Sequence, residues 1–498
     1  MQEKLKLLKE KMELLHRYYH ACAVISFDFE TIVPKDGREE EGKVLDFFSN
    51  EAFKIKNSEE MKQLTIDLYK GKEQIEDPLD RRLIELLYED LEKTINMTPE
   101  FDLKMSNIFS KAYGKWLEAK EKSDYSLFKD SFKEVIDIQK EAVELRENKL
   151  PNYYDNLLND CEKGMLQEDL DPFFQELKEG LIELINKIKN SKHEIRRDFL
   201  SRNVPIYKQE AFSRYLLNLN GYNFDKGAMT TTEHPFTMPL ARNDARVTTH
   251  YYENMFLSNI FSIIHEGGHA ILMQNERDCD HDHFINDNVS NGMHESVSRF
   301  YENVIGRSEE YIHLIYPKLQ ETFDEFKDVS ERELYEAVNI VEPSLVRTEA
   351  DEVTYGLHII IRYEMEKMIC NGQINVEDIP AMWNKLYKDY LGVDVPNDTL
   401  GVLQDVHWTG GFGYFPSYAI GNCYNAMYVK RLEKELPLWE LVEKGDFKTI
   451  NEWMKNNVFV HANVLSPKEW IKELTGESLS PKAFLEYLNN KYKDIYQL

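Results

Sequence analysis

Long intervals without proline are the feature of this sequence that most restricts its fold. No proline lies between residues 100 and 150 or between residues 240 and 316. Because proline interrupts the interior of a helix, these intervals can hold long continuous helices. Several stretches repeat apolar residues every three or four positions, which predicts amphipathic helices with one buried stripe, over residues 1–20, 80–96, 103–121 and 129–149. We therefore expect a mainly α protein.

One further helix has a start signal of its own. Asp171 is a good N-cap residue and Pro172 suits the first helical position, so the sequence predicts that a helix begins there. The apolar residues that follow have helical spacing, namely Phe174, Leu177, Leu181, Leu184, Ile185 and Ile188.

The pentapeptide His265-Glu266-Gly267-Gly268-His269 lies inside an apolar stretch. Residues four apart on a helix project from one face, so His265 and His269 can hold a metal ion between them, and Glu266 can reach water beside it. Each glycine weakens the helix by roughly 1 kcal/mol, and both suit a helix that another backbone or a substrate approaches closely. The pattern predicts a metal-dependent peptidase; the alternative is an amphipathic helix with two ordinary histidines.

A catalytic zinc site needs a third protein ligand and an open position for water. The candidate is Glu295, which lies 26 residues beyond His269 and leaves room for a loop and the start of a second helix. The apolar residues that follow it have approximately helical spacing, namely Val297, Phe300, Val304 and Ile305. Glu295 could equally be a solvated carboxylate, and the spacing alone leaves both interpretations open.

Strand-like sequence is confined to a short region before this helix. Residues 233–239 contain too many prolines for a helix. Residues 244–252 are rich in β-branched and aromatic side chains in partial alternation, which predicts one or two strands. We expect a small sheet beside the helix that carries the two histidines, since the backbone of an edge strand can bind an extended peptide.

The composition argues against several kinds of partner. The formal net charge is −28 at pH 7, and 42% of the residues are hydrophobic, enough for a sizeable core. An acidic surface repels phosphate backbones and anionic membranes, so we expect neither nucleic acid nor a membrane as a partner. The longest apolar runs fall far short of the ~20 residues that span a bilayer.

The cysteines indicate a reducing compartment. They number five, are widely scattered and include no Cys-x-x-Cys pair. The N-terminal residues form a charged amphipathic segment and not an apolar signal sequence, so we expect a cytoplasmic protein. Cys279 lies beside His281 and His283, which could form a second metal cluster, but we interpret this segment as a polar loop.

A glycine-rich segment follows later in the chain. Five of the 22 glycines lie between Gly401 and Gly421, among tryptophan, tyrosine and phenylalanine residues. We expect a mobile loop whose aromatic side chains form one wall of a cleft, and the alternative is an ordinary surface loop.

Six short motifs in a fixed order give a more specific signal than any one of them. They are His234-Pro-Phe, Asp244-Ala-Arg-Val-Thr-Thr, His265-Glu-Gly-Gly-His, His294-Glu-Ser, Val346-Arg-Thr-Glu-Ala-Asp and Gly401-Val-Leu-Gln-Asp-Val-His-Trp. This series resembles the carboxypeptidase Taq family of metallocarboxypeptidases. A weaker likeness to the family's N-terminal signature covers residues 27–37, where Phe27 replaces the usual tryptophan, and Val297 replaces the usual Gln or Gly after His-Glu-Ser.

The resemblance implies a mainly α, neurolysin-like gluzincin fold with a deep substrate groove and a small β-sheet beside the zinc-binding helix. We expect one domain over residues 1–498, in which residues 1–200 form a mostly helical wall and lid and residues 201–498 carry the metal site and the groove. The resemblance also implies a homodimer, one zinc ion that cobalt can replace, and the removal of single C-terminal residues from peptides. The implied metal ligands are His265, His269 and Glu295.

The residue types also suggest catalytic roles. Glu266 would act as the general base that takes a proton from the attacking water and passes it to the leaving amine. The oxyanion needs a further donor, for which His234 and Tyr418 are candidates and Tyr424 is a weaker alternative.

A planar guanidinium suits a free C-terminal carboxylate. Arg347 is our choice because it lies in a family motif, and Arg246 competes with it. For either residue the alternative is a structural ion pair, for instance with Asp351 or Asp244.

Other residues remain open to more than one interpretation. Asp351 and Asp405 are candidates to orient the imidazole ligands through their second ring nitrogens. His294 and His407 either line the site or are buried histidines.

Two other functions share these features. A helical gluzincin oligopeptidase or dipeptidyl carboxypeptidase would have the same metal motif and groove. An inactive scaffold that binds peptides is a different class, and the intact motif argues against it.

Overall fold

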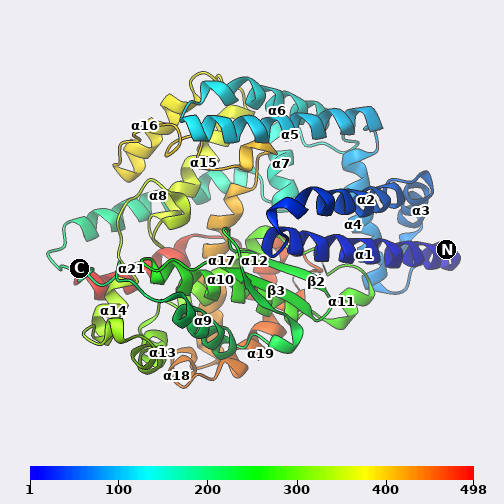
Figure 1. The fold of residues 1–498 in the computed structure, drawn as a ribbon. Coiled ribbons are helices and arrows are strands. Elements are labelled where there is room, and N and C mark those ends of the chain that lie inside the picture. The colour runs from blue at the N-terminus through cyan, green and yellow to red at the C-terminus, as the bar shows by residue number, and fades with distance from the viewer. Residues whose placement is uncertain (287, 462) are drawn as a thin grey trace.

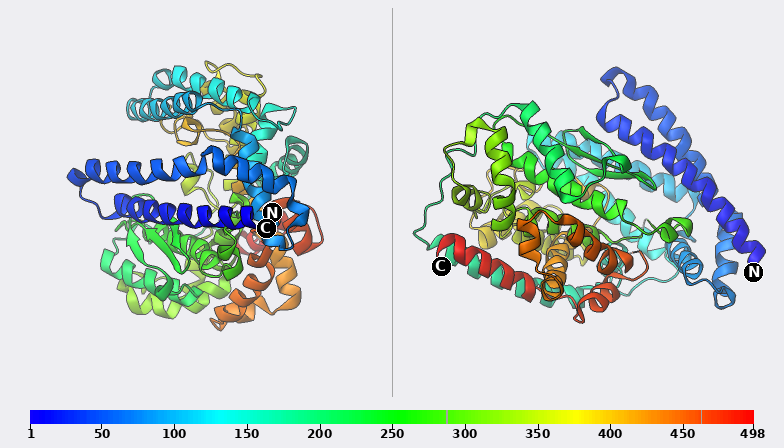
Figure 2. Two further views of the ribbon diagram at one scale, coloured as in Figure 1. Left: turned by 90° about the vertical axis from the view of Figure 1, so that its right-hand side faces the viewer. Right: turned by 90° about the horizontal axis from the view of Figure 1, so that it is seen from below.

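The protein is built mostly of helices around one small sheet (Figure 1). The structure is a computed structural model, and it describes residues 1–286, 288–461 and 463–498. The N- and C-termini lie on opposite sides of the molecule (Figure 1, Figure 2). The predicted mainly α fold with a small β-sheet is confirmed.

The N-terminal part of the chain consists of helices joined by short connections. They are α1 (Gln2–Thr31), α2 (Arg38–Lys56), α3 (Glu59–Lys70), α4 (Pro78–Thr94), α5 (Pro99–Lys122), α6 (Ser126–Glu144), α7 (Tyr153–Cys161) and α8 (Gln167–Lys189). The four stretches predicted as amphipathic helices correspond to α1, α4, α5 and α6, although the predictions 80–96 and 129–149 extend beyond the ends of α4 and α6. Helices α1 and α2 run side by side as a hairpin (Figure 2).

The rest of the chain carries the sheet and further helices. The helices are α9 (Ile206–Asn220), α10 (Phe256–Gln274), α11 (Asp278–Asp282), α12 (Asn291–Arg299), α13 (Glu309–Thr322), α14 (Glu331–Ala337), α15 (Tyr355–Cys370), α16 (Ile379–Leu391), α17 (Phe415–Glu435), α18 (Leu438–Glu443), α19 (Phe447–Asn457), α20 (Pro467–Thr475) and α21 (Lys482–Tyr496). None of the helices in the described residues combines the length with the apolar composition that a bilayer crossing requires.

The predicted start of α8 at Asp171 is wrong. The helix begins at Gln167 and contains Pro172 in its interior. The backbone N–H of Gln167 donates to Asp155 Oδ1 at 2.9 Å, so α7 supplies the cap. Asp171 instead accepts a hydrogen bond of 2.7 Å from the hydroxyl of Tyr363 on α15. The helix therefore begins about one turn before the predicted N-cap, where Asp169 accepts a hydrogen bond from the N–H of Leu166 and Asp155 accepts one from that of Gln167.

The sheet has three strands, β1 (Met229–Thr231), β2 (Thr237–Ala241) and β3 (Asp244–Thr249). The strand order is β1-β3-β2, in which β3 pairs parallel with β1 and antiparallel with β2. The central strand lies against α10, which is where the sequence predicted a sheet (Figure 1). Both outer strands are edges, and β2 begins at Thr237, one of the residues of the groove described below.

The buried apolar side chains fall into one large cluster and smaller ones. The large cluster extends from Ala112 in α5 to Tyr496 in α21 and includes most of α10 and α17. Helices α1 to α4 bury a separate set of side chains around Leu8, Leu68 and Ile84, which meets the rest of the molecule at Ile285.

Two glycines allow α10, α12 and α17 to pack with their backbones close together. A Cβ atom on Gly268 of α10 would lie 2.8 Å from Ser298 Cα on α12. A Cβ atom on Gly421 of α17 would lie 2.8 Å from Glu295 Cβ, also on α12. Any side chain at these positions would push α12 away from both neighbouring helices. The sequence suggested that another backbone approaches the glycines of α10, and at Gly268 this close approach is present.

Replacing Gly421 by alanine tests this packing. We expect Gly421→Ala to lower the free energy of unfolding by about 1–3 kcal/mol, because the added methyl group overpacks against Glu295. Gly114→Ala in α5 is the matched control, since a Cβ atom there meets nothing within 4 Å. The control should be neutral or gain up to about 1 kcal/mol of helix stability. Equal effects of the two changes in urea unfolding would contradict the packing argument.

Candidate active site

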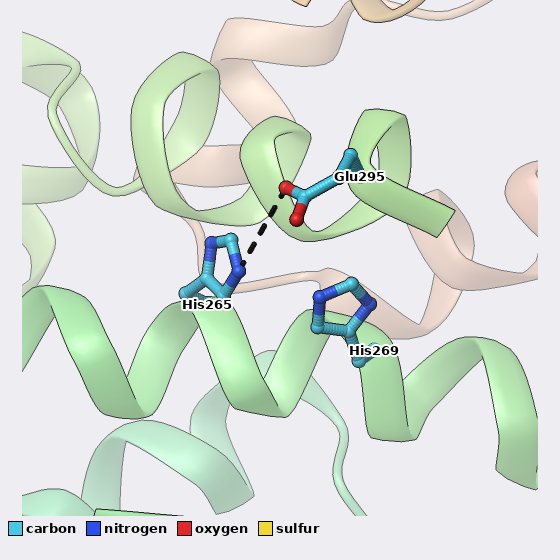
Figure 3. A group of neighbouring side chains, drawn as sticks. All are labelled: His265, His269 and Glu295. Atoms are coloured by element: carbon cyan, nitrogen blue, oxygen red, sulfur yellow. Dashed lines mark ion pairs between the residues drawn. The ribbon is translucent and has the colours of Figure 1, made fainter. Parts of the chain in front are cut away.

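The two histidines of α10 face the glutamate of α12 (Figure 3). One nitrogen from each of His265 and His269 and one carboxylate oxygen of Glu295 all lie within 4.8 Å of one another. His265 Nε2 is 3.9 Å from Glu295 Oε2, and the centroids of the two imidazole rings are 4.9 Å apart. Two nitrogens and one oxygen are a donor set that suits a catalytic zinc ion, so these residues could hold one.

A second glutamate fixes the orientation of His265. Glu302 Oε2 lies 2.9 Å from His265 Nδ1, which leaves Nε2 directed toward Glu295. Glu302 belongs to a π-helical turn, η4 (Phe300–Ile305), which continues α12. In this turn the N–H of Gly306 donates to Tyr301 O at 2.8 Å, which is the i→i+5 pattern of a π-helix. Glu302 thus takes the orienting role for which the sequence offered Asp351 or Asp405.

A mostly buried arginine compensates these carboxylates. Arg299 Nη1 lies 3.1 Å from Glu302 Oε2, and Arg299 Nε lies 3.5 Å from Glu295 Oε2. Burial alone would raise the pKa of Glu302, but the charges of Arg299 and His265 outweigh burial and hold this pKa far below its ordinary value. Burial lowers the pKa of His269 well below its ordinary value, so the ring is neutral and can offer a nitrogen lone pair.

Glu266 lies beside this group and is held by the sheet. Its side chain is buried, and burial raises the pKa of its carboxyl group. The hydroxyl of Thr237 on β2 donates to Glu266 Oε2 at 2.7 Å and lies 2.8 Å from the backbone oxygen of the same residue. Strand β2 therefore positions the glutamate that the motif predicts as a general base.

These residues open onto one groove of about 1250 Å³. Its lining brings together most of the predicted site residues, namely His234, His265, Glu266, His269, His294, Glu295, Arg347 and Tyr418. His234 comes from the loop between β1 and β2 and is exposed to solvent in the groove. Burial lowers the pKa of His294 to about 4, so this ring is neutral beside His269.

Arg347, the residue predicted to bind the substrate's C-terminal carboxylate, lines the groove and also forms an ion pair. It lies in a short 3₁₀ turn, η6 (Arg347–Glu349), and its Nε and Nη2 atoms lie 3.0 and 2.9 Å from Asp405 Oδ1. The other oxygen of Asp405 binds Arg362, which is fully buried. Two guanidinium groups share one carboxylate, so the network keeps one net positive charge.

Arg347 lines the groove, although its side chain is mostly buried. Its Nη1 atom has one long contact, 3.4 Å to the hydroxyl of Tyr355. The ring of Tyr418 lies 5.0 Å from the guanidinium carbon, so Tyr418 covers the cation. The competing candidate, Arg246, pairs with Asp244 at 2.8 Å and does not line the groove.

Several other candidates lie elsewhere. Tyr424 is fully buried against Trp470 and does not line the groove. Asp351 accepts hydrogen bonds from the backbone of Val353 and Thr354, so it caps a turn and orients no imidazole. His407 packs against Phe415 outside the groove lining, and burial lowers its pKa to about 4.

Segment 401–421, which we expected to form a mobile loop, contains the 3₁₀ helix η7 (His407–Thr409) and is held by hydrogen bonds. Its end forms the start of α17, which carries Tyr418. Glu366 of α15 accepts hydrogen bonds from Trp408 Nε1 at 3.0 Å and from the N–H of Gly413 at 2.9 Å. The hydroxyl of Tyr154 donates to the same carboxylate at 2.8 Å. The buried carboxyl group of Glu366 therefore holds the segment in place by hydrogen bonds. Tyr418 contributes to the groove wall, as predicted.

The segment around Cys279 is also not a loop, because residues 278–282 form α11. His281 Nε2 pairs with Glu276 at 3.0 Å. His283 Nε2 lies 3.2 Å from Asp77 and 3.7 Å from Asp80, and the three residues could hold a metal ion. Asp80 already forms an ion pair with Lys9, whose Nζ atom lies 2.6 Å away, so the charge of this carboxylate is neutralised by an ammonium group.

Four groups that matter here were missed from the sequence: Thr237, Arg299, Glu302 and Tyr414. Arg299 and Glu302 follow Glu295 by four and seven residues, so helical spacing on the same face was a usable signal. Thr237 carried no such signal, since its contact with Glu266 depends on how the sheet packs on α10. Tyr414 lines the groove beside Tyr418, at a ring distance of 5.3 Å.

The helical fold and this arrangement define a metallopeptidase of the His-Glu-x-x-His type with a glutamate as third candidate ligand. Residues 7–492 match the family described as carboxypeptidase Taq (M32) metallopeptidase. The chain belongs to this family, and is a metallocarboxypeptidase, a peptide hydrolase that uses a divalent metal ion.

Individual relatives agree over nearly the whole chain. Carboxypeptidase 1 of Bacillus subtilis is 40% identical over 497 residues, which cover 98% of this chain and 99% of that protein. Thermostable carboxypeptidase 1 of Thermus thermophilus is 34% identical, and the match covers 95% of both chains. The structure of the M32 carboxypeptidase from Deinococcus radiodurans R1 has a TM-score of 0.95 at 29% identity, with 100% of both chains covered.

Because Glu366, which holds segment 401–421 by hydrogen bonds, has a raised pKa, we predict that the stability of the protein depends on pH. Burial raises the pKa of Glu366 to about 7, whereas an unfolded glutamate titrates near ~4.3. Between these values the folded protein retains a proton that the unfolded chain has lost. The free energy of unfolding contributed by this group therefore falls by roughly 3–4 kcal/mol as the pH rises through that window.

Urea unfolding of wild type and Glu366→Gln between pH 4.5 and 8 measures this contribution. The wild type should lose stability relative to the variant as the pH rises, and the difference should level off above about pH 7. The exposed Glu452 provides a control, because Glu452→Gln should follow the wild type. Parallel profiles for wild type and Glu366→Gln would rule this explanation out.

Proposed function

We propose that His265, His269 and Glu295 bind one zinc ion, which cobalt can replace. The donor set supports this proposal, because two imidazole nitrogens and one carboxylate oxygen converge and leave a position open toward the groove. When bound, the ion supplies Lewis-acid chemistry: it acidifies water and polarises the scissile carbonyl.

Glu266 is the proposed general base. Its carboxylate is buried at the groove and held by the Thr237 hydroxyl, so it can take a proton from the attacking water without reorienting. Burial raises its pKa, which strengthens it as a base and prepares it to pass the proton to the leaving amine.

His234 and Tyr418 are the proposed donors to the oxyanion. Both line the groove from separate elements, the loop before β2 and the start of α17. Tyr418 and its neighbour Tyr414 line the same groove as the three proposed ligands. A neutral phenol donates one hydrogen bond, as an oxyanion requires.

Arg347 is the proposed binding residue for the substrate's C-terminal carboxylate. Its Nε atom is engaged by Asp405, Nη1 has one long contact with Tyr355, and the residue lines the groove. The shared carboxylate keeps the guanidinium in place and leaves a net positive charge that a substrate carboxylate can neutralise. This arrangement supports exopeptidase action and not internal cleavage.

We further propose that the enzyme releases single residues from the C-terminus, as a cytoplasmic homodimer. The free cysteines support a reducing compartment, and we keep the expectation of one domain over residues 1–498 with residues 1–200 as wall and lid. Incubating a defined peptide with zinc-loaded protein and following products by mass spectrometry tests the reaction. Stepwise loss of single residues is expected, whereas dipeptides or internal fragments would favour the oligopeptidase alternative.

Glu266→Gln separates metal binding from chemistry. The amide keeps the shape of the side chain but cannot accept the proton of water, so we expect turnover to fall at least about a hundredfold. Metal analysis should still find one zinc per chain. Glu253→Gln, outside the groove, is the control and should retain full activity. Turnover by Glu266→Gln at the wild-type rate would refute the assignment of the base.

Arg347→Ala tests the recognition of the carboxylate. We expect KM for an N-blocked dipeptide to rise at least about tenfold, because a charge-assisted hydrogen bond is lost, with zinc content unchanged. The corresponding C-terminal amide should be affected much less. Arg246→Ala removes a guanidinium outside the groove and should leave KM unchanged. If Arg347→Ala leaves the preference for the acid over the amide intact, another residue binds the carboxylate.

A further inference from the structure

The π-helical turn that carries Glu302 is also held by the last helix of the chain, α21. Glu302 contacts His265 through its side chain, and the next residue, Asn303, contacts α21 through its carbonyl group. The hydroxyl of Tyr487 donates to Asn303 O at 3.2 Å, and Lys491 Nζ lies 3.5 Å from the same oxygen. Glu302 and Asn303 share a peptide bond, so a shift of the Asn303 carbonyl group also moves the backbone from which the Glu302 side chain extends.

The backbone of the turn explains why this carbonyl group needs partners from another helix. The N–H of Gly306 donates to Tyr301 O in the i→i+5 pattern of a π-helix. The N–H of Ser308 would be the corresponding donor for Asn303 O, but it donates to Ile305 O at 2.9 Å instead. The π-helical pattern therefore ends before Asn303, and the last carbonyl groups of a helix are satisfied by groups outside it. Two side chains of α21 supply these groups.

Lys491 fixes the direction in which the Tyr487 hydroxyl group donates. Lys491 Nζ lies 3.1 Å from the oxygen of this hydroxyl. An ammonium group has donors and no acceptor, so the hydroxyl oxygen accepts a hydrogen bond from Lys491. The hydroxyl has a single hydrogen, and this hydrogen is directed to Asn303 O.

A buried ion pair holds Lys491 in this position. Its Nζ atom lies 2.8 Å from Glu352 Oε2, and the two side chains are 7% and 2% exposed. The hydroxyl of Tyr492 donates to the same carboxylate oxygen at 3.3 Å. Separating the two charges would leave each of them buried without a partner, which is strongly destabilising. The ammonium group that directs the Tyr487 hydroxyl is therefore itself fixed.

We propose that Tyr487 is a positioning residue for the metal site. Through the carbonyl group of Asn303 it holds the π-helical turn in place, so that Glu302 stays against His265 Nδ1 and Nε2 of the same ring stays directed toward Glu295. Groups that orient a ligand imidazole contribute to metal affinity. In this protein the orienting glutamate depends in turn on a tyrosine of the last helix. This inference rests on the proposed role of His265 as a metal ligand.

The affinity for zinc measures this role without reference to turnover. Zinc is titrated into the metal-free protein in competition with a chelator of known affinity. Tyr487→Phe removes the hydroxyl group and keeps the ring, so the Asn303 carbonyl group loses its tyrosine partner. We expect the Kd for zinc to rise at least about threefold. Loss of a group that contacts a ligand imidazole directly typically costs roughly 10–100-fold, and Tyr487 acts through one further residue.

Tyr492→Phe is the matched control. Tyr492 is buried and belongs to the same helix, and its hydroxyl donates to Glu352 instead of the π-helical turn. Both variants lose one hydrogen bond, so we expect both to lower the free energy of unfolding by similar small amounts. The Kd for zinc should keep its wild-type value in Tyr492→Phe, which separates the positioning of Glu302 from a general loss of stability.

A double-mutant cycle tests whether Tyr487 acts through Glu302. Glu302→Ala removes the contact with His265 and should raise the Kd for zinc at least about tenfold. Adding Tyr487→Phe to this variant should raise the Kd no further, because the contact that Tyr487 supports is already absent. An undiminished effect of Tyr487→Phe in that background, or a wild-type Kd for Tyr487→Phe alone, would overturn this inference. A wild-type protein that binds no zinc would overturn the proposed metal site instead.

Discussion

At Gly268 the backbone of α10 lies against that of α12, since a Cβ atom there would stand 2.8 Å from Ser298 Cα. This contact brings Glu295 opposite the two histidines of the motif. On another side, α17 packs against α12 at Gly421, next to the Cβ of Glu295. Backbones packed this closely have little freedom to shift, so the donor atoms are placed by helix packing and not by flexible loops.

Buried charges in the groove are arranged in compensated networks. Arg299 lies between Glu295 and Glu302, and Asp405 is shared by Arg347 and Arg362. Unpaired charges in such positions would be strongly destabilising, and these networks also hold the side chains at fixed angles.

The sequence was sufficient where function depends on local spacing. The four-residue spacing of His265 and His269 brings both rings to one face of a helix, and the β-branched run before it gives a strand that lies beside α10. The spacing in the sequence did not decide whether Glu295 is a metal ligand, and the family motifs favoured that role. The structure places its carboxylate beside the two histidines. The mainly helical fold followed from the scarcity of proline and the helical spacing of apolar residues.

The sequence was insufficient where position depends on distant partners. Segment 401–421 looked like a mobile loop because glycine is frequent, yet Glu366 of α15 pins it. Asp405 lies in a family motif but binds arginines, whereas Glu302, whose helical spacing from Glu295 was the only local signal, binds His265 from a π-helical turn. Pro172 was not the start of α8, because the helix begins at Gln167, where both Asp169 and Asp155 accept hydrogen bonds from its first backbone N–H groups. Tertiary contacts override local preference in each case.

The central claim is that α10 and α12 together hold the metal ion. Diffraction from crystals of zinc-loaded protein, with anomalous data collected on both sides of the zinc absorption edge, tests it most directly. We predict one strong anomalous peak bonded to His265, His269 and Glu295. A peak at Asp77, Asp80 and His283 instead, with none between the two helices, would contradict it.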